Sequence, residues 1–157
     1  MSRPALTPYS FRGLLFIPIA KNAHRSVVRA IKEAGGKKEY WNALPTLPRV
    51  ALIREPMDRA FSAYCMFALD GQFDGPFKDF LDTFPKDDMH LWTQWESMGA
   101  VEPDILIKWD FKKLSETLGL TIPHIGEGRK LDFPPIGFET KYAFDEYYKR
   151  DYDLWNQ

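Results

Sequence analysis

The sequence predicts an α/β fold, in which helices flank a mostly parallel central sheet. Short apolar segments typical of buried strands alternate with segments of helical periodicity, and this alternation favours parallel layers. The chain has 157 residues, 45% of them hydrophobic, which is enough to bury a core. Neither an internal repeat nor a linker divides the sequence, so we expect residues 1–157 to form one domain.

The first predicted unit is a strand, a loop and a helix. The apolar run GLLFIP at residues 13–18 is typical of a buried strand. Residues 19–23 form the turn that follows it. Helical spacing of apolar side chains then predicts a helix at residues 25–34, which Gly35 and Gly36 end.

The second unit repeats this order. Residues 49–53 (RVALI) predict another buried strand, and residues 57–69 predict a helix. Pro56 suits the first turn of that helix, where its missing N–H is not needed. Cys65, the single cysteine, lies in an apolar stretch, so we expect a buried structural thiol and a reducing compartment.

The remaining elements follow from shorter patterns. Residues 104–109 predict a third strand, and residues 120–130, which contain Pro and Gly, predict a loop. Helices are expected at residues 77–84, 87–99, 111–118 and 142–155.

Charge and composition exclude several classes of protein. The net charge of −1 and the lack of a recognisable module argue against nucleic-acid binding, and the scattered His and Cys residues predict no metal site. A signal peptide and an apolar run of membrane-spanning length are both missing, which predicts a cytoplasmic location. Residues 1–59 hold 11 Lys and Arg against 4 Asp and Glu, a basic balance that suits an anionic ligand.

The loop before the first helix has the features of an anion site. Residues 18–26 read P-I-A-K-N-A-H-R-S. Backbone N–H groups at a helix N-terminus bind phosphate or sulfate, and Lys21, Arg25 and Ser26 add donors there. Because the Walker A glycines are missing, this is not a nucleoside-triphosphate P-loop. An ordinary strand–helix turn with a surface lysine would look the same.

The loop after the second strand carries a longer polar pattern. Residues 54–64 read R-E-P-M-D-R-A-F-S-A-Y. Arg54 would emerge at the carboxyl edge of the sheet, where a guanidinium clamps a phosphate, and the Ser62 hydroxyl could donate to the same anion. Arg59 could instead pair with Glu55 and Asp58 and be structural.

Together the two loops resemble the signature motifs of the PAPS-dependent sulfotransferases, especially the carbohydrate type. The second loop matches the pattern R-x-P-x-x-R-x-x-S-x-Y at every stated position. The first resembles P-K-x-A-G-T-S through Lys21, Ala23 and Ser26, while His24 and Arg25 replace Gly and Thr. Weaker similarity continues through H-L-W-T-Q at residues 90–94 and Y-Y-K-R-D-Y-D-L-W at residues 147–155.

The resemblance implies a P-loop-like sulfotransferase fold and a transferase that moves a sulfonate from PAPS to a hydroxyl or amine. PAPS is then the co-substrate and PAP the product. Lys21 would stabilise the leaving group and His90, or failing that His24, would act as the general base. The 5′ end would lie on the loop and the 3′-phosphate on the second motif, with two further cations closing over the nucleotide. The implied binding residues are Lys21, Asn22, Ala23, His24, Arg25, Ser26, Arg54, Ser62, Arg129 and Lys130.

Two alternatives stay open from the sequence. The replacements at His24 and Arg25 suit a degenerate relative that binds PAP without transferring sulfonate, and a P-loop phosphotransferase is a weaker option. The sequence does not distinguish a carbohydrate acceptor from a small molecule, nor does it predict an oligomeric state.

Overall fold

Five strands form one open sheet in the order β3-β1-β2-β4-β5. The computed structural model describes residues 6–123 and 133–157. Three strands, β2, β4 and β5, run parallel, whereas β1 pairs antiparallel with both β2 and β3. The strands are β1 (Tyr9–Phe11), β2 (Leu14–Phe16), β3 (Lys37–Lys38), β4 (Arg49–Ile53) and β5 (Ile105–Lys108).

The α/β class is confirmed, but the expectation of a mostly parallel sheet is wrong, because the sheet is mixed. The predicted strand at residues 13–18 is the second arm of a hairpin with β1. Arg12 and Gly13 form its turn with φ angles of 48° and 76°. Two consecutive positive φ values are typical of the turn that joins two twisted antiparallel strands.

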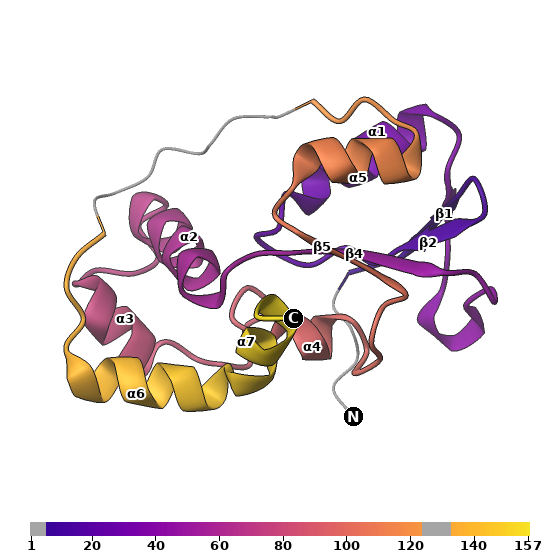
Figure 1. Cartoon of the computed structure of the whole chain (residues 1–157). Coiled ribbons are helices and arrows are strands. Elements are labelled where there is room, and N and C mark those ends of the chain that lie inside the picture. The colour runs from indigo at the N-terminus through magenta and orange to yellow at the C-terminus, as the bar shows by residue number, and fades with distance from the viewer. Residues whose placement is uncertain (1–5, 124–132) are drawn as a thin grey trace.

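Helices cover both faces of the sheet, as Figure 1 shows. Alternate residues of β4 point to opposite faces, because side chains alternate along a strand. Val50 and Leu52 pack with α1 and α5, whereas Ala51 and Ile53 pack with α4 and α7. The helices are α1 (His24–Glu33), α2 (Pro56–Leu69), α3 (Phe77–Thr83), α4 (Gln94–Ser97), α5 (Phe111–Leu118), α6 (Phe138–Tyr147) and α7 (Lys149–Trp155), with a 3-10 turn at Trp41–Ala43.

A third apolar cluster lies beyond the sheet, among α2, α3 and α6 (Figure 1). It is rich in aromatic rings, and Tyr64 and Phe67 of α2 belong to it. Cys65 is buried there too. Since α2 leaves directly from the carboxyl end of β4, this cluster fixes α2 against the edge where the two candidate loops lie.

Two predicted helices differ from the structure. Residues 87–99 begin as turns, and only Gln94–Ser97 is helical, because Thr93 and Glu96 form a capping box that starts the helix there. The predicted helix at residues 142–155 is two helices. Tyr148 interrupts it with a ψ of 19°, and its hydroxyl donates to the Leu91 carbonyl.

Candidate functional site

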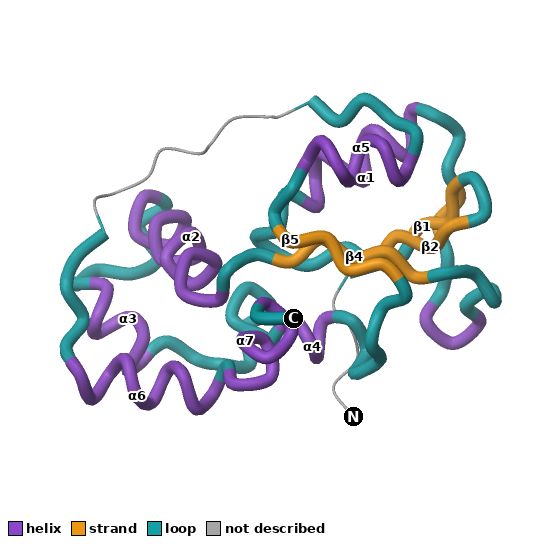
Figure 2. Tube along the Cα trace, in the orientation of Figure 1, coloured by secondary structure: helices purple, strands orange, loops and turns teal. Residues whose placement is uncertain are grey.

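The two candidate loops lie next to each other at the carboxyl edge of the sheet. Parallel pairing of β2 with β4 places the ends of both strands at the same edge. Residues 17–23 lead from β2 into α1, and Arg54 and Glu55 lead from β4 into α2 (Figure 2). The structure therefore brings the two sequence motifs together, as their positions after parallel strands predicted.

The first loop has an unusual backbone. Lys21 and Ala23 have left-handed φ angles of 65° and 55°, which non-glycine residues adopt at a cost. The Asn22 N–H donates to the Ile19 carbonyl at 3.1 Å and closes the turn. The following helix has no acidic residue in its first turn, so its N-terminal N–H groups face no carboxylate of their own helix. This geometry suits an anion.

Gln94 fixes the positions of the two loops relative to each other. Its Oε1 accepts from Asn22 Nδ2 at 2.6 Å and from the Arg54 N–H at 2.9 Å, and its Nε2 donates to the Arg54 carbonyl at 2.8 Å. The side chain is fully buried. Asp151 of α7 in turn accepts from the Gln94 and Trp95 N–H groups. These hydrogen bonds thus connect four distant parts of the chain, around Asn22, Arg54, Gln94 and Asp151, and fix the positions of both loops.

Arg54 is buried and already engaged. Its Nε donates to Asp58, its NH1 donates to the Lys21 carbonyl at 3.2 Å, and its guanidinium lies 4.4 Å from the ring centroid of Trp109. Trp109 follows β5 at the same edge with a positive φ of 46°. Arg54, which was predicted to bind a phosphate, therefore lies at the predicted edge of the sheet. Two of its guanidinium nitrogens, however, already donate to protein groups.

Arg59 is structural, though not with the partners that its sequence neighbours suggested. It is only 2% exposed, and it donates to the carbonyls of Ala20 at 2.9 Å and Trp92 at 2.7 Å. Asp58 pairs with Arg54 instead. Burial lowers the pKa of the Arg59 guanidinium, and the charges of Tyr148 and Asp151 oppose this shift.

The site gathers positive charge. Burial is the main cause that lowers the pKa of Lys21, and the charges of Arg54, Arg25 and Arg59 lower it further. Cys65 of α2 acts in the opposite direction, which places Lys21 near that helix. Ser62 lies one turn from Cys65 and one turn from Asp58, so these three share a face of α2. Ser26 is buried in the first turn of α1.

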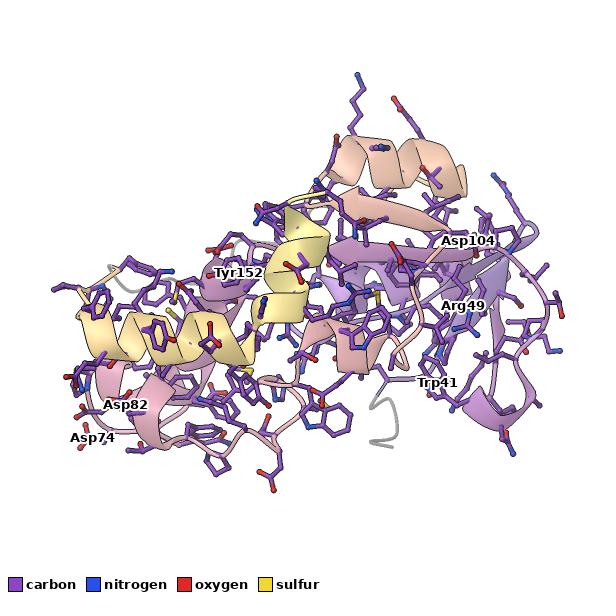
Figure 3. The ribbon with its side chains drawn as sticks, turned by 60° about the horizontal axis from the view of Figure 1, so that its bottom comes forward. Trp41, Arg49, Asp74, Asp82, Asp104 and Tyr152 are labelled. Carbon is purple, nitrogen blue, oxygen red and sulfur yellow. The ribbon has the colours of Figure 1, made fainter. Side chains whose placement is uncertain are left out.

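The opposite edge of the sheet carries an arginine next to an acidic side chain. Figure 3 shows Arg49 and Asp104 at the end of the sheet away from α3 and α6. There the Asp104 carboxylate accepts from the Arg49 N–H at 2.7 Å. Arg49 therefore lies at the edge away from the two candidate loops.

The two candidate bases, His24 and His90, lie close enough to interact electrostatically. Burial, followed by the charges of Arg25, His90 and Lys21, lowers the pKa of His24 to about 4. His90 Nδ1 lies 2.7 Å from Asp88 Oδ1, and its ring meets Phe67 edge-on at 5.4 Å between centroids. Both candidate bases are thus brought to the same region, and the lowered pKa keeps His24 neutral at physiological pH.

The lowered pKa of His24 makes a testable contribution to stability. Between pH 6.5 and 4 the unfolded chain takes up a proton that the folded chain resists, so stability falls as the pH falls through this window. Because His24 is only partly buried, solvent screening limits the loss to ~1–2 kcal/mol. We expect His24→Gln to lose less stability than wild type between pH 7 and 4.5 in urea unfolding. Equal losses in both proteins would contradict the assignment.

Arg129 and Lys130, predicted to close over the nucleotide, lie outside the described residues. Gln94, Asp88 and Trp109 were not predicted as site residues. Gln94 lies in the motif H-L-W-T-Q and Trp109 ends the predicted strand 104–109, whereas no sequence pattern pointed to Asp88. Across residues 6–123 and 133–157, His, Cys, Asp and Glu form no group of three or more that could hold a metal ion.

In the same ranges, no helix is long and apolar enough to cross a bilayer. Comparison of the chain with protein-family models, curated proteins and solved structures finds no match in any of the three.

Proposed function

We propose that this protein binds adenosine 3′-phosphate 5′-phosphosulfate at the carboxyl edge of its sheet and transfers the sulfonate to a hydroxyl or amine acceptor. The observation that carries the proposal is the convergence of Lys21, Arg25 and Arg54 on the N-terminal end of α1. Burial, and then repulsion from Arg54 and Arg25, lowers the pKa of Lys21, and Asp58 is the one carboxylate paired with the three cations among the described residues. A bound anion of two or more charges would relieve this repulsion.

Both anionic groups of the nucleotide have a matching feature. The left-handed turn at Lys21 and Ala23, together with the first turn of α1, suits the 5′-phosphosulfate. Arg54 and Ser62 would hold the 3′-phosphate. For this, Arg54 must share its guanidinium with the phosphate or release Asp58, whose side chain is 43% exposed to solvent. The mixed α/β layers are compatible with a sulfotransferase-type fold.

The transfer itself needs orientation and charge stabilisation. The acceptor oxygen or nitrogen attacks sulfur while the bond from sulfur to the bridging phosphate oxygen breaks. Lys21 would stabilise the negative charge that develops on the departing 5′-phosphate. His90 would take the acceptor proton.

One observation favours the second candidate, a relative that binds PAP without transfer. His24 occupies the first helical position, where the sulfotransferase pattern has Gly, and the side chain is partly buried within the loop. If it fills the space of the sulfonate, the loop would accept the 5′-phosphate of PAP alone. Sulfonate release from labelled PAPS, assayed with carbohydrate, phenol and amine acceptors, distinguishes the two candidates.

Calorimetry with PAP and AMP tests the 3′-phosphate site. Charge-assisted hydrogen bonds of this kind contribute ~1.5–3 kcal/mol, so we expect Arg54→Met to weaken PAP binding by ~10–150-fold. AMP binding should change little, because AMP lacks the 3′-phosphate. Ser62→Ala should weaken PAP binding by about tenfold.

A matched control is available on the same strand. Arg49 is the first residue of β4 and Arg54 follows its last, so Arg49→Met removes an arginine at the opposite edge. We expect this variant to bind PAP as wild type does. An unchanged preference for PAP over AMP in Arg54→Met would reject the 3′-phosphate assignment, even if the variant were less stable.

A further inference from the structure

Asp88 makes two contacts with His90 that fix the imidazole. Its Oδ1 accepts from the His90 backbone N–H at 2.9 Å and lies 2.7 Å from His90 Nδ1. Because a carboxylate only accepts, the proton of the neutral imidazole lies on Nδ1. Nε2 is then the nitrogen with a free lone pair, and it is the nitrogen that can take a proton.

The turn that carries this pair is anchored at both sides. The Leu91 and Trp92 N–H groups donate to the Asp88 carbonyl at 2.9 and 3.1 Å. Further along, the Leu91 carbonyl accepts from Tyr148, and the Trp92 carbonyl accepts from Arg59. The turn that carries the imidazole is therefore fixed by hydrogen bonds from α2 and from Tyr148, between α6 and α7. A side chain that orients a catalytic group needs such rigid support.

The surroundings of His90 connect it to the first loop. Its ring is 19% exposed and meets the edge of Phe67 from α2. From α1, His24 interacts with it electrostatically. Arg59 also links the two segments, because it donates to the Ala20 carbonyl of the first loop and to the Trp92 carbonyl two residues after His90. Asp88 is the carboxylate in direct contact with the ring. His90 thus lies beside the loop that would hold the reacting sulfonate.

We propose that Asp88 is a positioning residue, which sets the tautomer of His90 and stabilises the imidazolium formed during transfer. This inference rests on the proposed function. As the acceptor oxygen bonds to sulfur, its proton moves to His90 Nε2. The bond from sulfur to the bridging oxygen breaks, and its electron pair stays on the 5′-phosphate of PAP. The imidazolium, paired with Asp88, later gives the proton to water.

Asp88→Asn separates this role from a structural one. The Asn carbonyl oxygen can still accept from both the His90 N–H and Nδ1–H, as Asp88 Oδ1 does, so the turn and the tautomer are kept and only the negative charge is lost. We expect sulfonate transfer to fall by ~10²-fold while PAP binding stays unchanged. The ¹⁵N spectrum of His90 should keep the proton on Nδ1 in this variant, whereas in Asp88→Ala, which removes the acceptor, the proton should be shared between Nδ1 and Nε2.

Asp87→Asn is the matched control, since Asp87 is the exposed neighbour on the same turn. It should keep the wild-type rate and tautomer. In a double-mutant cycle, Asp88→Asn should have no further effect once His90→Gln is present, because Asp88 acts through His90.

The outcomes distinguish this inference from the proposed function. Wild-type protein that neither binds PAP nor turns over PAPS rejects the proposed function and the inference with it. Normal wild-type turnover with an unchanged rate in Asp88→Asn overturns the inference alone. So does an additive loss in the double variant, because that would show Asp88 acting independently of His90.

Discussion

Replacing Lys21 with methionine should abolish turnover while raising the stability of the protein without ligand. Lys21 is partly buried beside Arg54 and Arg25, and both burial and these charges lower its pKa. The folded state therefore carries an unfavourable charge at neutral pH, which methionine removes. Turnover should fall by ~10³-fold, because the leaving phosphate loses its cation. Sulfonate release from labelled PAPS and thermal unfolding measure the two effects.

The sign of the stability change depends on pH. The folded pKa of Lys21 lies below the unfolded value of 10.5, so the charge penalty is complete below the folded pKa. It disappears as the pH rises through the folded pKa towards 10.5. We therefore expect the advantage of Lys21→Met in unfolding midpoint at pH 7 to shrink at pH 10. An advantage that grows with pH would contradict the assignment.

Two further measurements complete this test. Added sulfate or PAP should raise the unfolding midpoint of wild type more than that of Lys21→Met, since a ligand stabilises the state that binds it. Lys32→Met is the control, because Lys32 is exposed in the last turn of α1 and lies over the Tyr9 ring. That variant should gain no stability and keep full turnover. The same gain in both would indicate a general effect of removing charge.

The local sequence predicted the central elements well and the sheet edge poorly. β4 coincides with residues 49–53, and the helix predicted at residues 111–118 coincides with α5, because Asp110 caps its start and Gly119 ends it with a φ of 63°. The hairpin of β1 and β2 was missed because its turn begins with Arg12, which is an uncommon residue at positive φ. Arg12 is held there by donating to the Gly119 carbonyl, more than a hundred residues away.

The candidate site shows the same division between local and distant causes. Lys21, Arg54 and Ser62 could be proposed because each follows a strand or lies on the helix after one. Gln94 could not, since its role depends on hydrogen bonds to Asn22 and to Arg54, which lie 72 and 40 residues away. The partner of Asp58 was likewise unpredictable, because Arg54 and Arg59 are both within reach of it along the sequence.

Arg59→Met should be the most destabilising substitution at the site. Arg59 is almost completely buried, and it links the Ala20 carbonyl of the first loop to the Trp92 carbonyl of the turn after His90. Methionine fills much of the volume but leaves both buried carbonyls without a donor, at ~1–3 kcal/mol each. The loss is partly offset, because the buried charge and its unpartnered NH2 are also removed. We expect a net loss of ~2–4 kcal/mol, or ~5–15 °C in unfolding midpoint.

Arg29→Met is the matched control for this prediction. Arg29 forms an exposed ion pair with Glu33 at 2.9 Å, and such pairs contribute ~0.3–0.5 kcal/mol. Because Arg59 holds the first loop, its variant should also bind PAP more weakly at temperatures where it remains folded, whereas Arg29→Met should bind normally. Equal unfolding midpoints for the two variants would mean that the loop and the turn are held by Gln94 and its neighbours without Arg59. If Arg59→Met is destabilised but keeps its PAP affinity, Arg59 stabilises the fold and does not determine the geometry of the anion site.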